Sequence, residues 1–296
     1  MKKDKKPLVK DPAIKDEKPL VKDPAKKDEK PINQDPVCET AYMNDFVRPF
    51  FFDGKKKDEC ILLLHGFTGS PADMLPIASY LNKDGEGYPV CGILLPGHGT
   101  KMEDMMHCNW KMWVVYATTQ LKKLLELYPK VSIIGFSMGG DIALCLASKF
   151  KANRIVTIST PIIIKNKLNY IAEFLSVFRK YTYWKIPKPQ DGELVFKYQT
   201  GYIGMPVRSI AQLRKLTIAT FNRLHRVRAP ILIIQSVNDR EVHLKSPYII
   251  FDNVKSEYKE LALMENSRHN AIIGPEHDKI YKMIETFLEK DIVPKK

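Results

Sequence analysis

The segment Gly-Phe-Ser-Met-Gly-Gly at residues 135–140 constrains the fold more than any other part of the chain. It follows an apolar run at 131–134 and precedes an apolar, helix-forming stretch at 141–147. A strand that turns into a helix within about two residues needs glycine wherever a side chain would collide with neighbouring backbone. Such an elbow presents its central residue to the substrate, which makes Ser137 the candidate nucleophile.

A serine hydroxyl attacks a carbonyl only when a base accepts its proton and donors stabilise the oxyanion that forms. Three further segments give the context for such partners. An apolar run at 61–64 leads into His65-Gly66-Phe67-Thr68-Gly69, a second strand end reads Leu95-Pro96-Gly97-His98-Gly99, and two tryptophans follow at 110 and 113.

With these segments in this order, residues 58–290 resemble the α/β-hydrolase superfamily, and within it the small bacterial carboxylesterases and monoacylglycerol lipases. The resemblance implies an α/β fold with a mostly parallel central sheet flanked by helices and a small helical cap. It also implies an oxyanion hole built from the main-chain N–H groups of Phe67 and Met138. His65 and His98 are expected to shape their loops through hydrogen bonds.

In this fold the acid and the base follow the nucleophile, each at the end of a later strand. The apolar run 230–235 reads as a buried strand, and Asp239 in the loop after it is the candidate acid, with Glu241 as the alternative. The run 258–264 reads as the last strand.

The loop after that last strand contains His269, the candidate base. His277 is the alternative, although it falls in the first turn of the helix predicted after Pro275. Relatives usually have a small residue just before the histidine, whereas this chain has Arg268. That cation is expected to point into solvent; the other readings are that it depresses the imidazole pKa or reaches an anionic substrate group.

The three side chains predict a serine carboxylesterase that cleaves short-to-medium-chain carboxylic esters through an acyl-enzyme, with monoacylglycerols as the first physiological class to test. The substrate partner is therefore a small-molecule ester, and no cofactor or metal is required. One alternative is a related acyl hydrolase or acyltransferase acting on thioesters, amides or polyesters. The other is a non-catalytic interaction protein whose N-terminal segment docks a partner.

The domain organisation is expected to be a tail followed by one folded domain. Residues 1–36 repeat a Lys/Pro-rich pattern every 12 residues, with starts at Lys6, Lys18 and Lys30. Without aromatic residues this tail buries too little apolar surface to fold, so it is expected to be disordered. Residues 37–296 then form the α/β-hydrolase domain.

Residues 161 to about 205 interrupt the alternation of strands and helices, and they are expected to form the cap. An apolar helix is predicted at 170–178, followed by Tyr181, Tyr183, Trp184 and Ile186. These side chains either line an acyl pocket or pack a cap helix onto the core, since both arrangements give the same periodicity. A long amphipathic helix is predicted from Val207 to Arg226.

Charge and cysteine content bound the partners and the compartment. The net charge is +13, but 11 lysines face 8 acids in residues 1–36, and the remaining excess is spread over the fold. Lysines interleaved with acids predict a solvated basic surface and weak attraction to anionic membranes, not nucleic-acid binding. Five cysteines without C-x-x-C spacing predict reduced, buried thiols. No export signal or spanning segment is visible, so a cytoplasmic location is expected. The oligomeric state stays open.

Overall fold

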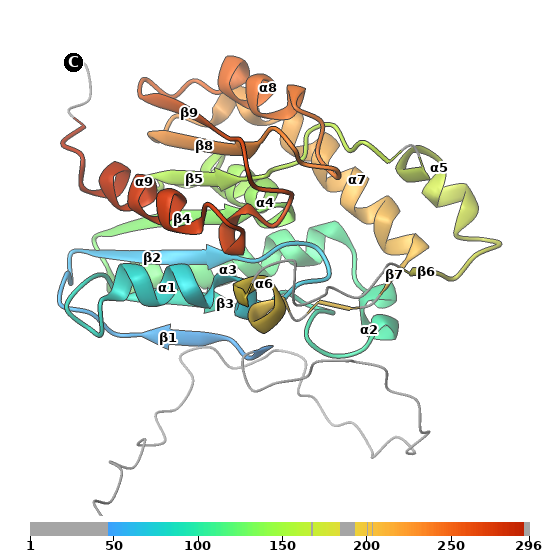
Figure 1. Ribbon diagram of the computed structural model, residues 1–296, viewed down its shortest axis with the longest axis horizontal. Helices are drawn as coiled ribbons and strands as arrows, with labels where there is room; N and C mark the ends of the chain where they lie inside the picture. The colour runs from blue at the N-terminus through green and yellow to red at the C-terminus, as the bar shows by residue number, and fades with distance from the viewer. Residues whose placement is uncertain (1–46, 167, 184–192, 200, 203, 293–296) are drawn as a thin grey trace, which may run out of the picture. The chain divides into compact units, whose positions relative to one another are not determined.

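The computed structural model describes residues 47–166, 168–183, 193–199, 201–202 and 204–292 (Figure 1). The predictions made for the tail at 1–36, and for Cys38, Trp184 and Ile186, lie outside the described residues.

A seven-stranded sheet in the order β1-β3-β2-β4-β5-β8-β9 forms the centre of the described structure. Only β1 runs antiparallel to its neighbour; every other pairing in the sheet is parallel. The predicted, mostly parallel sheet is therefore confirmed. Its strands are β1 Phe50–Phe52, β2 Glu59–Leu64, β3 Val90–Ile93, β4 Lys130–Phe136, β5 Ile155–Ile158, β8 Ile231–Ser236 and β9 Lys259–Met264.

Helices cover both faces of the sheet, because the central strands are apolar on both sides. In β2, Leu62 and Leu64 pack in the cluster that contains α3, α4, α7 and α8, whereas Ile61 and Leu63 pack in the cluster that contains α1 and α9 (Figure 1). The helices have the bounds α1 Leu75–Asn82, α2 Met102–His107, α3 Trp110–Leu127, α4 Met138–Ala147, α7 Val207–Phe221, α8 Lys245–Asn253 and α9 His277–Glu289.

The insertion, defined as residues 161–206 between β5 and α7, contains more than the helices predicted for it. It holds α5 Leu168–Leu175 and α6 Glu193–Tyr198, together with a two-stranded antiparallel sheet of β6 Tyr181–Tyr183 and β7 Gly204–Pro206. The predicted helix over 170–178 ends at Leu175, and the predicted helix over 207–226 ends at Phe221. Leu224–Arg226 forms a separate 3-10 turn after it.

Two further expectations concern the interior and the membrane. Cys60, Cys91, Cys108 and Cys145 are buried free thiols, as the cysteine pattern predicts. Among the described residues, no helix combines the length and the apolar character that crossing a bilayer demands.

Candidate active site

Ser137 occupies the turn between β4 and α4, and its backbone has φ 51° and ψ −121°. A non-glycine residue with positive φ is strained, and the close packing of the glycines around it holds it there. A Cβ on Gly139 would lie 2.1 Å from the carbonyl oxygen of Leu64, and one on Gly135 would lie 2.3 Å from the oxygen of Gly139. The start of α4 therefore lies directly against the end of β2.

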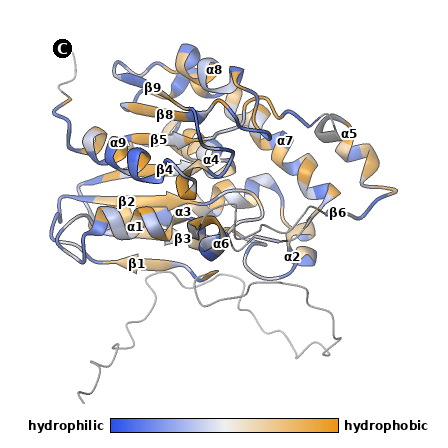
Figure 2. Ribbon diagram, in the orientation of Figure 1, coloured by the Kyte–Doolittle hydropathy of each residue, from blue (hydrophilic) through white to orange (hydrophobic). Residues whose placement is uncertain are grey.

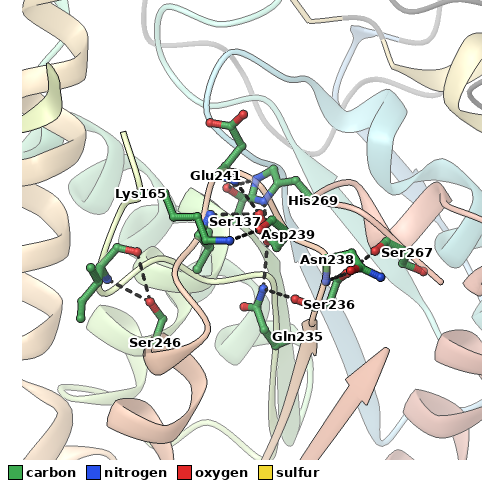
Figure 3. Close-up of polar contacts among 12 residues, drawn as sticks. Ser137, Lys165, Gln235, Ser236, Asn238, Asp239, Glu241, Ser246, Ser267 and His269 are labelled. Atoms are coloured by element: carbon green, nitrogen blue, oxygen red, sulfur yellow. Dashed lines mark hydrogen bonds and ion pairs between the residues drawn. The ribbon is translucent and has the colours of Figure 1, made fainter. Parts of the chain in front are cut away.

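The structure brings the predicted serine, histidine and aspartate together at one edge of the sheet (Figure 3). His269 Nε2 lies 3.0 Å from Ser137 Oγ, and His269 Nδ1 lies 2.9 Å from Asp239 Oδ2. The three residues come from the loops after β4, β8 and β9, whose carboxyl ends meet because the strands are parallel. The Asp239 side chain is 1% exposed and that of His269 is 22% exposed.

Four donors hold the buried Asp239 carboxylate. The backbone N–H groups of Glu241 and Val242 donate to Oδ1 at 2.8 and 2.9 Å, and Gln235 Nε2 donates to Oδ2 at 2.9 Å beside His269. Burial by itself opposes ionisation, but the hydrogen bond and charge of His269 and the two N–H groups outweigh it. The pKa of Asp239 is consequently lowered below its ordinary 3.8.

The two alternative residues lie elsewhere in the hydrogen-bond network. Glu241 is exposed, and its bond to Asp239 comes from its backbone N–H. His277 begins α9, where its Nδ1 contacts the Gly274 carbonyl at 2.8 Å and its Nε2 lies 3.3 Å from Asp278. Arg268, the departure from the usual pattern, is exposed.

The two predicted oxyanion residues flank the serine. A Cβ on Gly66 would lie 3.3 Å from Ser137 Cβ, so the loop after β2 lies against Ser137, and Met138 is the first residue of α4. Within the part of the chain that the structure describes, neither the Phe67 nor the Met138 N–H donates a hydrogen bond.

Buried aromatic rings support the Phe67 loop. His98 makes edge-to-face contacts with Phe67 and Trp113 at 6.3 and 5.9 Å between ring centres. The Leu95 N–H donates to His65 Nε2 at 3.1 Å, so the proton of this imidazole is on Nδ1, which donates to the Gly66 carbonyl. Burial lowers the pKa of His65 to about 4. Both histidines are structural, as the sequence indicates.

Residues beyond the predicted set tie the insertion to the site. At its start, Ser246 Oγ accepts the N–H groups of Ile162 and Ile163 at 3.2 and 2.9 Å, and the Lys165 ammonium donates to the Asp239 carbonyl. At its end, the Tyr202 N–H donates to the Thr68 carbonyl at 3.2 Å. The Tyr202 hydroxyl also donates to the Gly97 carbonyl at 2.9 Å.

Gln235, Tyr202 and Ser246 also contact the site or the insertion, and the sequence carries a signal only for Gln235. Gln235 is a polar residue inside the apolar run of β8, four residues before Asp239, and this contrast marks it. Tyr202 and Ser246 occupy segments with no such contrast, and only the folded chain shows what they bind.

A mostly parallel sheet with a serine elbow after β4, a histidine in hydrogen-bond contact with that serine and an aspartate in hydrogen-bond contact with the histidine define an α/β-hydrolase. Residues 55–276 match the family described as serine aminopeptidase, S33, and the chain belongs to this family. It is a serine hydrolase of the α/β-hydrolase superfamily.

Two relatives cover most of the chain. A carboxylesterase of Bacillus subtilis (strain 168) is 29% identical over 246 residues, which span 82% of this chain and 96% of the relative. A thermostable monoacylglycerol lipase of Bacillus sp. (strain H-257) is 30% identical over 230 residues, which span 78% of this chain and 90% of the relative.

Solved structures agree with this placement. A structure from a study of the metagenome-derived lipolytic enzymes LipS and LipT is 27% identical, with a TM-score of 0.75, and covers 82% of this chain and 98% of that one. The monoacylglycerol lipase of Paleococcus ferrophilus is 15% identical with a TM-score of 0.68, covers 81% of this chain and 97% of that one, and supports the fold.

The role of Gln235 gives a pH-dependent prediction. Gln235→Leu removes a hydrogen-bond donor to the Asp239 carboxylate, a bond worth about 1.5–3 kcal/mol, and the loss of a donor to the charged form should raise the pKa of this carboxyl group. A lowered pKa contributes stability that is present above pH 3.8 and is lost as the pH falls through the folded-state pKa. Denaturant unfolding should therefore show a deficit for the variant that is full at pH 5–7 and shrinks below pH 3.8.

Gln120→Leu is the matched control, because Gln120 is also a buried glutamine but lies in α3. Its effect on the free energy of unfolding should not change over the same pH range. A deficit for Gln235→Leu that is equally large at pH 3 and pH 7 would show that this side chain serves packing alone.

Proposed function

We propose that this chain is a serine carboxylesterase that hydrolyses short-to-medium-chain carboxylic esters, with Ser137 as nucleophile, His269 as base and Asp239 as acid. The observation that carries the proposal is the continuous pair of hydrogen bonds from Ser137 Oγ through His269 to Asp239, at 3.0 and 2.9 Å. A base within hydrogen-bond reach of a hydroxyl, itself oriented by a carboxylate, is the arrangement that activates serine.

The reaction follows from where the protons go. Neutral His269 accepts the Ser137 proton at Nε2 as Oγ attacks the ester carbonyl, and then returns it to the leaving alcohol, so that an acyl-serine remains. Asp239 keeps the Nδ1–H tautomer in place and stabilises the imidazolium. Water, deprotonated by the same nitrogen, releases the acid and restores the serine.

The oxyanion is assigned to the N–H groups of Phe67 and Met138. Removing one donor from such a site typically slows turnover about 10²–10³-fold. Because both donors are main-chain N–H groups, their positions depend on the conformation of the loop and not on the identity of a side chain. The aromatic contacts of Phe67 with His98 and Trp113 support this role because they hold the loop beside Ser137.

The ester class rests on the relatives, which are named as a carboxylesterase and a monoacylglycerol lipase. The alternative is amide or peptide hydrolysis with the same three residues, since the family description names an aminopeptidase. A thioester or polyester specialist, or an acyltransferase, would also use this site.

The nucleophile and base assignments predict a specific pattern of loss. Ser137→Ala should lower turnover of p-nitrophenyl butyrate by at least about 10³-fold and abolish fluorophosphonate labelling, because no other residue takes over the attack. His269→Ala should cause a loss of similar size. His277→Ala is the control and should retain activity; if it were inactive while His269→Ala turned over normally, the base would be His277.

The substrate class predicts an acyl-length profile. Ester hydrolysis should be most efficient for p-nitrophenyl butyrate to decanoate and for monoacylglycerols of similar acyl length, measured as kcat/KM. Aminoacyl p-nitroanilides are the matched comparison for the amide alternative. A higher kcat/KM on the anilides than on any ester would replace the esterase assignment with a peptidase.

We further propose that the catalytic unit is the domain at 37–296, with the insertion at about 161–205 as its cap and residues 1–36 as a tail outside the reaction. Deleting residues 1–36 should leave kcat/KM on a soluble ester within about twofold of the full chain, because the hydrogen bonds that join Ser137, His269, Asp239 and Gln235 are made by residues of the folded domain. A collapse of turnover in a folded truncated protein would assign the tail to the site.

A further inference from the structure

The outer side of the insertion exposes a row of large apolar side chains. We call this row the cap face; it consists of Tyr170, Ile171, Phe174, Val177 and Phe178. Their exposed fractions run from 51% for Ile171 to 77% for Val177, and orange, the hydrophobic colour, marks much of the coloured part of α5 in Figure 2. Apolar side chains that are exposed together mark a binding surface.

The inner side of α5 is already packed, which fixes the direction of the cap face. Ala172 is fully buried in a small cluster with Val207, Ile210 and Ala211 of α7, and Leu175 packs against the same cluster. The helix α5 therefore has one apolar side that packs on the protein and a second apolar side that is exposed to solvent. Among the described residues, packing accounts for the inner side of α5 and leaves each of the five side chains of the cap face more than half exposed.

Cations surround the cap face. Arg179 and Lys180 follow Phe178 directly and are exposed, and the Arg214 guanidinium lies 5.1 Å from the centre of the Tyr170 ring. In the sequence, residues 194–238 contain seven Lys or Arg and no Asp or Glu.

An acid does lie within the surface itself. Glu173 is paired with the Lys215 ammonium at 2.6 Å, so its charge is balanced by α7. This part of the molecule therefore combines exposed aromatic and aliphatic side chains with an excess of positive charge.

We propose that the cap face docks this protein on an anionic lipid surface. Aromatic and aliphatic side chains enter the boundary between headgroups and acyl chains, while lysine and arginine next to them contact anionic headgroups. An excess of cations beside exposed apolar side chains matches an anionic membrane leaflet, whose negative charge is spread over its whole surface. The source is the bilayer surface itself, not a free phosphate.

The location of the cap face joins this surface to the proposed esterase site. Phe67, one of the proposed oxyanion residues, packs against the same cluster that receives the inner side of α5. An acyl ester that leaves a lipid surface would thus meet the insertion next to the loop that contains Phe67. Docking itself does not depend on the proposed function, since binding needs no turnover.

The test measures flotation of the full chain with vesicles of phosphatidylcholine alone and with 30% phosphatidylglycerol. The wild type and Ser137→Ala should float equally with the anionic vesicles and at least about tenfold less with the neutral ones. Phe174→Ser/Phe178→Ser should lose at least about tenfold in partitioning. Arg179→Glu/Lys180→Glu should lose about fivefold or more per cation removed and respond little to phosphatidylglycerol.

Leu127→Ser/Tyr248→Ser is the matched control, because these large apolar residues are 59% and 45% exposed but belong to α3 and α8. It should float like the wild type, and all variants except Ser137→Ala should cleave a soluble ester at the wild-type rate, which verifies the fold. Three results would overturn the proposal. The first is that Phe174→Ser/Phe178→Ser floats as well as the wild type, and the second is that the wild type binds both vesicle types equally. The third is that sedimentation velocity shows a dimer for the wild type and a monomer for this double variant, while the wild type does not bind vesicles.

Discussion

The contact between the first turn of α4 and the ends of β2 and β5 is the constraint on which the site depends. A Cβ on Gly140 would lie 1.7 Å from Thr160 Oγ1, and one on Gly139 would run into the backbone of Leu64 and His65. Only glycine allows this approach, and the approach in turn keeps Ser137 at positive φ. The strain at one residue is therefore held by packing among three strands and a helix, and the hydroxyl has a fixed position relative to the loop that contains Phe67.

A second constraint is electrostatic. An ionised carboxylate that is almost fully buried is costly unless donors surround it, and Asp239 has four. Two are backbone N–H groups of its own loop, so the turn that follows β8 both places and stabilises the charge. The remaining two come from a neighbouring strand residue and from the imidazole, which is thereby held in one tautomer. The loop of Asp239 thus surrounds a buried charge with donors, whereas the turn at Ser137 depends on glycines that leave room for close backbone packing.

The positions of the turn at Ser137 and of the loops that hold Asp239 and His269 were predictable from local sequence. The elbow and the loops that hold Asp239 and His269 follow apolar runs directly, and parallel strands necessarily gather their carboxyl ends at one edge. The apolar stripe at 170–178 was less informative, because periodicity predicts that a face is apolar but not what covers it. Neither reading of that stripe included solvent, yet Phe174 and Phe178 are 68% and 74% exposed. Gln235 carried a local contrast. Tyr202 carried none, because its partners at Thr68 and Gly97 are more than a hundred residues away in the sequence.

The anchoring of the insertion at both of its ends has a consequence for how such a chain can diverge. Lys165 fixes its start to the Asp239 loop, Ser246 fixes Ile163 to α8, and Tyr202 fixes its end to the loop of Phe67. Between these two points the polypeptide can change in length and composition at small entropic cost, since loop closure depends only weakly on length. Under the proposed function, the catalytic groups are then insulated from changes in the groups of the insertion that meet the substrate. Selection on the middle of the insertion can then alter which substrates reach Ser137, while the hydrogen bonds from Ser137 through His269 to Asp239 keep their geometry.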